Sequence, residues 1–512
     1  MRWAATGVVA AALFVIPGVA QASVSDATLA RLGLTHALHR HWLKPADVTH
    51  YRALLWRAGR DMRRLPKLRA QVIASQLSQL MPMRDSYVSP RALALFTQLQ
   101  VNLDYLETHR IPPDRVDVTG DDGVVYRWFP EHGLEFHPLA SFSALNASRD
   151  PALAAALVAR GIPRGNRLIW EYSFRFGSGH PPWASGMAQA VAAQALSRAG
   201  LLAAAQRAYA SVPPLTMQLR KGPWIRLYGF TSEIVLNAQL QTVVSLLEYA
   251  DTTGDQSAAG FAQRLLAAAQ AYFPSFDTGD WSRYELRGAY ASRSYQEYVT
   301  TLLRQLAAKT EDPFWTATSQ RFRAYLLSPA TITQPVPTAP IWPQPADGYL
   351  DTAILQISLS QRASVTLAIA GKVTTYRLSA GAHTLSWKPP DGLAAGTYPV
   401  SLSTVTYAGN RATVQLQPLV VNWDTQPPAI GASVGGNVLS WQSTDIGTPS
   451  LALAVDLVDP AGVQPQQTLD LGQLPLNGTL PLTVPPGAWD ATLRATNSAG
   501  LTTTISLGPL TG

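Results

Sequence analysis

The hydrophobic pattern of this 512-residue chain changes its period once, and that change constrains the fold more than any other feature. Up to about residue 327, apolar residues recur at three- and four-residue spacing, which predicts amphipathic helices. Beyond residue 346, apolar and polar residues alternate in short runs between Gly, Pro and Asn turns, which predicts strands. We therefore expect a multidomain chain, all-α in its N-terminal part and all-β after it.

The helical blocks follow one another as hairpins that must pack side by side, so we expect an α/α toroid over residues 23–327. Turn residues mixed with aromatics predict an irregular β and loop segment at 110–165. Six prolines in 328–346 predict a stiff extended linker. The alternating runs in 347–424 and in 425–512 predict two β-sandwich modules of the immunoglobulin or fibronectin type.

The first 22 residues have the pattern of a secretion signal, with Arg2, a short apolar run and an A-x-A site ending at Ala22. That run is too short for a comfortable membrane span, and we expect no transmembrane segment elsewhere. The sequence thus predicts a secreted or extracytoplasmic protein of the periplasm or cell envelope. Because it has no cysteine, disulfides and thiolate chemistry are excluded.

The charge is uneven along the chain. Residues 1–329 contain 34 Lys and Arg against 24 Asp and Glu, a net charge of +10, whereas residues 330–512 contain 6 against 9, a net charge of −3. A polyanionic partner should therefore meet the first part. In an extracytoplasmic compartment this favours an acidic polysaccharide, and no nucleic-acid motif is present. The sequence does not indicate an oligomeric state.

The histidines do not form a metal motif. His36, His39 and His41 are spaced by three and two residues, which does not hold all three on one helix face. The segment "EHGLEFH" offers Glu135 and His137 among its possible ligands, but it matches no motif of known mechanism. Phosphate-loop, dinucleotide and G-x-S-x-G patterns are also absent, so we expect no metal and no cofactor.

The stretch "FDTGDWSRYELRGAYASRSYQEY", residues 276–298, contains four tyrosines and three arginines. This stretch and the helical segment after it resemble part of the C-terminal catalytic domain of the D-glucuronyl C5-epimerases, and the resemblance covers about residues 165–327. "PPWASGMAQAVAAQAL" and "LYGFTSEIVLN" resemble two upstream motifs of that family, in the same order. The resemblance implies that glucuronate is converted to iduronate within a polysaccharide.

The family's catalytic residues carry over to Tyr228, Tyr284, Tyr295 and Arg287. The resemblance and the surrounding residues also suggest sugar contacts from a further set: Trp183, Ser185, Gln189, Asn237 and Glu285. The sequence departs from the family at four positions: Leu227 replaces an acidic residue, Glu285 replaces an aspartate, Gly288 replaces a histidine and Val299 stands where a histidine is expected.

Tyrosine and arginine suit this chemistry because epimerisation needs two acid–base groups, one on each face of the sugar. A phenol has an ordinary pKa of about 10, so a cation such as Arg287 is expected to favour the phenolate. Arginine also pairs bidentately with a carboxylate. Tyr290 and Tyr298 are expected to pack.

Three alternatives remain open. A uronate lyase begins with the same proton abstraction, and a glycan-binding protein without activity needs only the scaffold. A glycosidase needs two carboxylates at a suitable separation, and Asp277, Asp280, Glu285 and Glu297 lie near one another in sequence.

Overall fold

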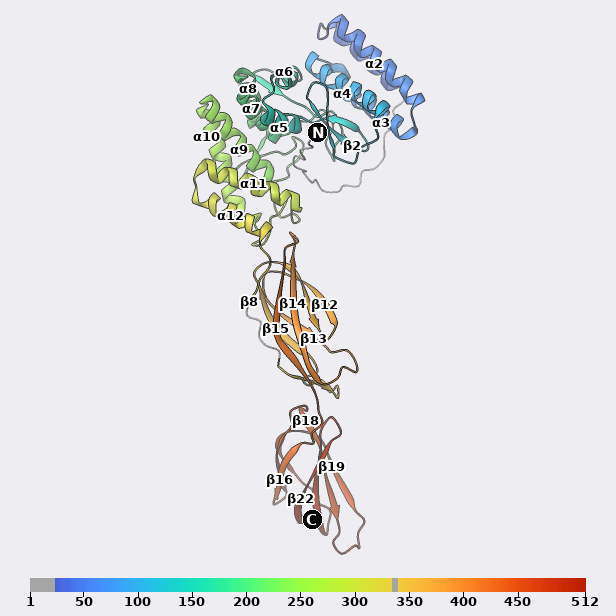
Figure 1. Ribbon diagram of the computed structural model, residues 1–512, viewed down its shortest axis with the longest axis vertical. Coiled ribbons are helices and arrows are strands. Elements are labelled where there is room, and N and C mark those ends of the chain that lie inside the picture. The colour runs from blue at the N-terminus through green and yellow to red at the C-terminus, as the bar shows by residue number, and fades with distance from the viewer. Residues whose placement is uncertain (1–23, 334–338) are drawn as a thin grey trace. The chain divides into compact units, whose positions relative to one another are not determined.

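A computed structural model describes residues 24–333 and 339–512, so the predicted secretion signal lies outside the described residues. The chain divides between Leu326 and Leu327 into two compact units. Helices dominate the first unit and strands make up the second, as Figure 1 shows. The predicted order of a helical part followed by a strand-rich part is thus confirmed, although the first unit also contains short strands.

Within the described residues, helices of 8 to 20 residues make up most of the first unit. They are α1 (Val24–His39), α2 (Pro45–Arg64), α3 (Lys67–Leu80), α4 (Ser89–Thr108), α5 (Pro138–Ser148), α6 (Pro151–Ala159), α7 (Gly186–Arg198), α8 (Leu202–Tyr209), α9 (Leu236–Thr253), α10 (Gln256–Tyr272), α11 (Arg293–Thr310) and α12 (Pro313–Leu327). None of the helices in this described part combines the length and apolar character that crossing a membrane requires.

Helices α5, α7, α9 and α11 lie side by side in a row, and α8 and α10 pack against α7 and α9. Helix α7 is buried along most of its length, which its alanines allow because their small side chains let neighbouring helices approach closely. The structure thus shows a row of packed helical hairpins. The closed ring stays a prediction.

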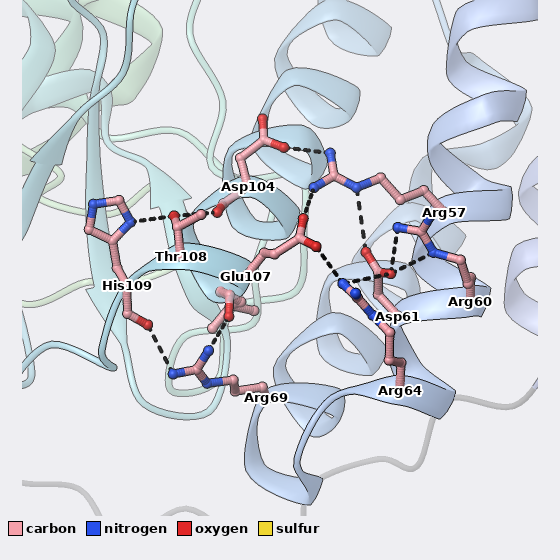
Figure 2. A network of polar contacts seen from close by, with 10 residues as sticks. Arg57, Arg60, Asp61, Arg64, Arg69, Asp104, Glu107, Thr108 and His109 are labelled. Carbon is pink, nitrogen blue, oxygen red and sulfur yellow. Dashed lines mark hydrogen bonds and ion pairs between the residues drawn. The ribbon is translucent and has the colours of Figure 1, made fainter.

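An ion-pair network joins α2 to α4 (Figure 2). The buried Asp61 of α2 pairs with Arg57 and Arg60 of the same helix, at 3.4 and 2.8 Å. Arg57 also reaches across to Glu107 of α4, with 3.0 Å between Nη2 and Oε2. The polar edge of this helix pair is therefore cross-linked by charge.

Short strands interrupt the helices of the first unit. Strands β1 (Asp117–Thr119), β2 (Val125–Phe129) and β3 (Gly133–Phe136) form an antiparallel sheet. Two hairpins follow, β4 (Ile162–Arg164) with β5 (Arg167–Ile169) and β6 (Thr216–Leu219) with β7 (Gly222–Ile225).

The segment 110–165, expected to be irregular, also contains the helices α5 and α6. Helix α5 begins where the His137 ring accepts a hydrogen bond from the Ala140 N–H at 3.1 Å. Pro138 then occupies the first turn, and Phe142 is buried. A cap, a first-turn proline and a buried apolar side chain suffice for a helix of 11 residues, which the mixed composition of the surrounding segment concealed.

The second unit consists of two pairs of antiparallel-rich sheets, each pair with its own apolar core. The first pair contains β8 (Ile332–Thr333), β9 (Ile341–Gln344), β10 (Ala353–Leu359), β11 (Ala363–Ile369), β12 (Lys372–Leu378), β13 (Gly381–Trp387), β14 (Gly396–Thr406) and β15 (Arg411–Trp423). The second pair contains β16 (Ala429–Gly435), β17 (Val438–Thr444), β18 (Ser450–Val458), β19 (Gln467–Pro475), β20 (Asn477–Pro481), β21 (Ala488–Thr496) and β22 (Thr502–Thr511).

Parts of the predicted linker 328–346 are strands of the first pair of sheets. Strand β8 pairs with β10, and β9 pairs in parallel with β15. Ile341 lies in the apolar core of this pair. An isolated four-residue strand gives little periodic signal, so its pairing follows from contacts with residues some 80 positions away.

Candidate functional site

A pocket in the first unit lies where the β1–β3 sheet, the start of α7 and the chain after β7 meet. Most of its wall is aromatic or aliphatic, with a few polar and basic side chains. It is lined by Arg115, Arg127, Phe129, His137, Leu139, Tyr172, Phe174, Phe176, Trp183, Ser185, Met187, Leu227, Tyr228 and Asn237. This composition is typical of a site for a small organic ligand.

Backbone hydrogen bonds hold Tyr228 beside Trp183. The Gly229 N–H donates to the Ala184 carbonyl at 2.7 Å, and the Gly186 N–H donates to the Arg226 carbonyl at 3.1 Å. A side chain at Gly186 would collide with Ile225, because an added Cβ would lie 2.6 Å from its Cδ1. Glycine thus lets the chain after β7 approach the start of α7.

The aromatic wall is a set of rings in direct contact. Tyr172 and Trp183 stack with their centroids 4.1 Å apart and their planes 6° from parallel. Tyr228 meets Trp183 edge-on at 5.4 Å and stacks on Phe230 at 5.6 Å. The Trp183 Nε1–H donates to the Phe174 carbonyl at 2.7 Å, so the indole is fixed in place.

The polar side of the pocket is basic. Arg127 of β2 is held by its cross-strand partner Asp117, with Nε and Nη2 2.7 and 2.8 Å from the two carboxylate oxygens. Arg115 lies on the chain that leads into β1 and also lines the pocket.

Burial and the nearby charge of Arg127 hold the pKa of His137 well below its usual range. Because its Nδ1 accepts the Ala140 N–H, the proton of the neutral ring lies on Nε2. The pocket therefore presents cations and a donor, which suit a carboxylate.

The phenol of Tyr228 is protonated in this environment. Burial, together with the charge of Glu233, raises its pKa to about 12, although Arg115 and Arg127 act to lower it. Burial also raises the pKa of Tyr284, with contributions from Tyr228 and Glu233. The expectation that a cation would favour a resting phenolate is not met, because desolvation is the larger effect.

Tyr295 joins the Tyr284 segment to α9. The buried Tyr295 hydroxyl donates to the Tyr284 carbonyl at 3.2 Å and accepts the Asn237 N–H at 3.0 Å. The two rings are in contact, with centroids 4.7 Å apart. Ser292 caps α11 by accepting the Tyr295 N–H at 3.2 Å, which fixes this ring at the first turn. Tyr295 thus bonds to the backbone, and it is not among the residues that line the pocket.

Arg287 lies in an exposed turn after Tyr284, with a left-handed backbone of φ 64°. It is not among the pocket's lining residues. The turn is closed by the Gly288 N–H, which donates to the Glu285 carbonyl at 3.0 Å. The cations that line the pocket are Arg115 and Arg127, and carboxylate binding by Arg287 stays a prediction.

Gln189 does not reach the pocket. Its side-chain amide is buried, and it accepts the Trp170 N–H at 3.1 Å and donates to the Trp170 carbonyl at 3.0 Å. Ser185 and Asn237 do line the pocket. Asn237 Oδ1 is buried and has no hydrogen-bond partner within the described residues. An orphaned acceptor in a pocket is costly unless a ligand donor meets it.

Sequence reasoning missed Arg115, Arg127 and Glu233. Glu233 lies on the segment that runs beside Glu285, where Val235 and Glu285 form an isolated β-bridge. Partial desolvation raises the pKa of Glu233, and the charge of Glu285 raises it further. At the position of Leu227 the resembled family has an acidic residue. Its replacement by leucine is the sequence signal that could have prompted a search for another carboxylate nearby.

The carboxylate of Asp277 binds two side chains of α12. It accepts the Tyr325 hydroxyl at 2.9 Å and pairs with Arg321 at 2.8 Å. Asp277 therefore anchors the D-T-G turn to the last helix of the unit. Within the residues that the structure describes, no group of three or more acidic or histidine side chains is arranged to hold a metal ion.

The segment that carries these tyrosines matches a known family. Residues 164–324 match the family of the D-glucuronyl C5-epimerase C-terminus. The match supports an epimerase-like function that acts on carbohydrate. Within the pocket, Tyr228, Trp183 and Asn237 come from this epimerase-like segment, whereas Arg115 and Arg127 precede it.

Solved structures show only partial likeness. An endoglucanase from Komagataeibacter sucrofermentans is 15% identical, with 34% of this chain and 68% of that chain covered and a TM-score of 0.26. The endo-beta-1,4-glucanase CMCax from Acetobacter xylinum is 15% identical, with 44% and 76% covered and a TM-score of 0.27. A two-domain fibronectin type-III segment of chicken tenascin is 14% identical, with 36% and 97% covered and a TM-score of 0.14. At these scores none of the three bears on the chemistry of the pocket.

Proposed function

We propose that the first unit epimerises uronate residues at C5 in an acidic polysaccharide. The observation that carries the proposal is that the epimerase-like segment contributes Tyr228, Trp183 and Asn237 to a pocket that is also lined by the arginines Arg115 and Arg127. A uronate offers an apolar ring face for the aromatic wall, hydroxyls for Asn237 and a carboxylate for the cations. Arg287, in the exposed turn, would meet the carboxylate or its neighbour from the solvent side.

The proton chemistry follows from the pKa directions. The C5 proton passes to a carboxylate base, which we assign to Glu233, an exposed residue outside the pocket's lining, because it is the carboxylate whose charge raises the pKa of both Tyr228 and Tyr284. The electron pair of the broken C–H bond moves into the substrate carboxylate, where Arg115 and Arg127 stabilise it.

The Tyr228 hydroxyl then gives its proton to C5 from the opposite face, and exchange with solvent restores both groups. Tyr284 is the second phenol beside these groups. Tyr295 positions it rather than touching substrate. No step of this sequence calls for a cofactor.

The wider organisation forms part of the same proposal. The row of hairpins would be one arc of an α/α toroid over residues 23–327, followed by two sandwich modules at 347–424 and 425–512. Cleavage near Ala22 would release the protein to the envelope or the medium, where acidic polysaccharides are found.

Deuterium incorporation at C5, measured in heavy water on uronate polymers, tests the proposal. We expect incorporation without chain cleavage for the wild-type chain, and loss of it for Tyr228→Phe and Glu233→Gln with the fold retained. An unsaturated, cleaved product would identify a lyase instead. Binding without any exchange, lost in Asn237→Ala, would identify a glycan-binding protein.

A further inference from the structure

The outward face of α2 carries an aromatic and basic stripe. Arg52, Trp56, Arg60 and Arg63 follow one another at spacings of four, four and three residues, which places them on one side of the helix. The opposite side of the helix is buried. Its buried residues are Tyr51, Asp61 and several aliphatic residues. We define Arg52, Trp56, Arg60 and Arg63, with Lys67 at the start of α3, as the α2 stripe.

Trp56 is the unusual member of the stripe. Its side chain is 60% exposed, although tryptophan is among the most buried residue types on average. The Arg60 guanidinium lies over the indole at 5.7 Å from the ring centroid. An exposed indole flanked by guanidinium groups offers a flat apolar surface beside fixed positive charge.

The acids near the stripe are already paired, as Figure 2 shows. Asp61 is engaged by Arg57 and Arg60, while Glu107 is engaged by Arg57 and Arg64. Asp104 pairs with Arg57 as well.

Between Pro45 and Leu80 the sequence has seven Arg and Lys against two Asp, so α2 and α3 keep a positive excess even with Asp104 and Glu107 included. The exposed Arg63 and Lys67 are absent from the ion pairs of the described chain.

Arg52 is oriented rather than neutralised. Its Nη2 donates to the Thr35 hydroxyl of α1 at 2.8 Å, a contact with an uncharged group. The charge of Arg52 therefore still acts on a ligand, while its position at one end of the stripe is fixed by α1.

We propose that the α2 stripe is a second binding surface for the acidic polysaccharide, outside the pocket. This inference rests on the proposed function for the identity of the partner. The pyranose ring presents apolar C–H groups that fit the exposed face of Trp56, and successive carboxylates along the chain fit Arg52, Arg63 and Lys67. Such a surface holds polymer near the enzyme and lowers KM for long chains, but it does nothing for a substrate too short to reach it.

The test compares full-length chains that lose the same charge at different places. The stripe variant is Arg52→Gln, Arg63→Gln and Lys67→Gln, and the control is Arg220→Gln, Arg304→Gln and Arg323→Gln, which are exposed elsewhere on the unit. The ligand is an alternating glucuronate–N-acetylglucosamine polymer, with a tetrasaccharide of the same repeat for comparison. Titration calorimetry at low and high salt gives Kd, and C5 deuterium exchange gives kcat and KM.

We expect polymer affinity to fall about tenfold for the stripe variant at low salt and less at high salt, since each exposed ion pair contributes little by itself and is screened by salt. Trp56→Ala should weaken polymer binding severalfold at both salt concentrations. KM for the polymer should rise while kcat and the kinetics on the tetrasaccharide stay unchanged. The control should keep wild-type affinity.

Equal losses in the stripe and control variants would overturn the proposal, since the effect would then be one of net charge. Single-stranded DNA of similar charge that bound as tightly and depended equally on Trp56 would overturn it too, by indicating an unselective polyanion surface. If wild type shows no C5 exchange but the stripe variant loses polymer binding, the proposed function fails and the surface stands. If C5 exchange is normal but the stripe variant keeps wild-type polymer affinity, the proposed function stands and the second binding surface is overturned.

Discussion

The hydroxyl of Tyr295 accepts the backbone N–H of Asn237 across a distance of 3.0 Å, which ties α11 to the start of α9. The same hydroxyl donates to the Tyr284 carbonyl. The phenol thus satisfies the N–H of Asn237, a residue of the pocket, and shares the Tyr284 carbonyl with the Leu236 N–H at 3.5 Å.

Tyr295→Phe should therefore act mainly on structure. It leaves the buried Asn237 N–H without this partner, while the Tyr284 carbonyl keeps the Leu236 N–H at 3.5 Å, so we expect unfolding free energy to fall by about 1–3 kcal/mol. Urea denaturation measures this loss. Tyr298→Phe is the matched control, because the Tyr298 hydroxyl bonds only to the Gln241 side chain at 2.6 Å in the described structure. Complete loss of C5 exchange with unchanged stability would instead make Tyr295 a catalytic group.

The turn at Gly288 explains one departure from the family pattern. A Cβ at Gly288 would lie 2.2 Å from Glu285 Cγ, so a histidine cannot return there while Glu285 keeps this position. We expect Gly288→Ala to cost about 1–3 kcal/mol as an overpacked site. Glu285→Ala removes the colliding atoms, so the double variant should recover much of the loss. A double-mutant cycle without coupling would show that the turn relaxes in another way.

The sequence predicted the parts of the site that local pattern encodes. Trp183, Ser185, Tyr228 and Asn237 lie on motifs that are contiguous in sequence, and the structure brings them to one pocket. Gln189 lies on one of the same motifs, but its side-chain amide is hydrogen-bonded to the backbone of Trp170. A side chain's direction depends on the turn of the helix and on its packing, neither of which a motif specifies.

The basic side of the pocket could not be predicted in this way. Arg115 and Arg127 are about 100 residues before Tyr228, in a segment without a strong period. Their approach to the pocket depends on the β1–β3 sheet, whose strands have only three to five residues. Non-local pairing of such short strands leaves almost no periodic signal.

Glu135 should make stability depend on pH. Burial raises the pKa of its carboxyl to about 8 from the ordinary 4.5, although Gln76, Gln79 and Gln98 donate to it. The folded state therefore binds a proton that the unfolded state has released, and this contribution is fully present below about pH 4.5 and lost as pH rises toward 8. The slope approaches about 1.4 kcal/mol per pH unit in that window.

Denaturation of the wild type and of Glu135→Gln at several pH values between 5 and 8 isolates this effect. The difference between the two chains should shrink or reverse as pH rises. A parallel pair of curves would mean that Glu135 is ionised in the folded state at neutral pH.

Gly59 offers a substitution that should stabilise the chain. It lies inside α2, and no heavy atom lies within 4 Å of an added Cβ. Gly59→Ala should raise unfolding free energy by about 0.5–1 kcal/mol through helix propensity alone. The opposite result is expected for Gly186→Ala in α7, where the Cβ would meet Ile225 and the Arg226 carbonyl at 2.6 and 2.8 Å. Shifts of the denaturation midpoint at a constant m-value would measure the change in unfolding free energy for both variants.

The assignment of Glu233 as the base predicts the acid side of the activity profile. A base must be deprotonated, so kcat/KM should rise with pH through the pKa of Glu233, which partial desolvation and Glu285 hold above the usual carboxyl range. Tyr228, with a pKa raised to about 12, stays a proton donor throughout the neutral range.

Replacing Glu285 by glutamine removes the neighbouring charge and should shift the acid limb to lower pH, while Glu233→Gln should abolish exchange. Measuring kcat/KM from C5 deuterium incorporation across pH 4–9 distinguishes the two effects. If Glu233→Gln retained wild-type activity and an unchanged acid limb, the base would have to be another group, and Tyr284→Phe is the next variant to measure. Glu233 and Tyr228 therefore give the proposed chemistry its sharpest test, because the reaction requires Glu233 to be deprotonated while Tyr228 is protonated.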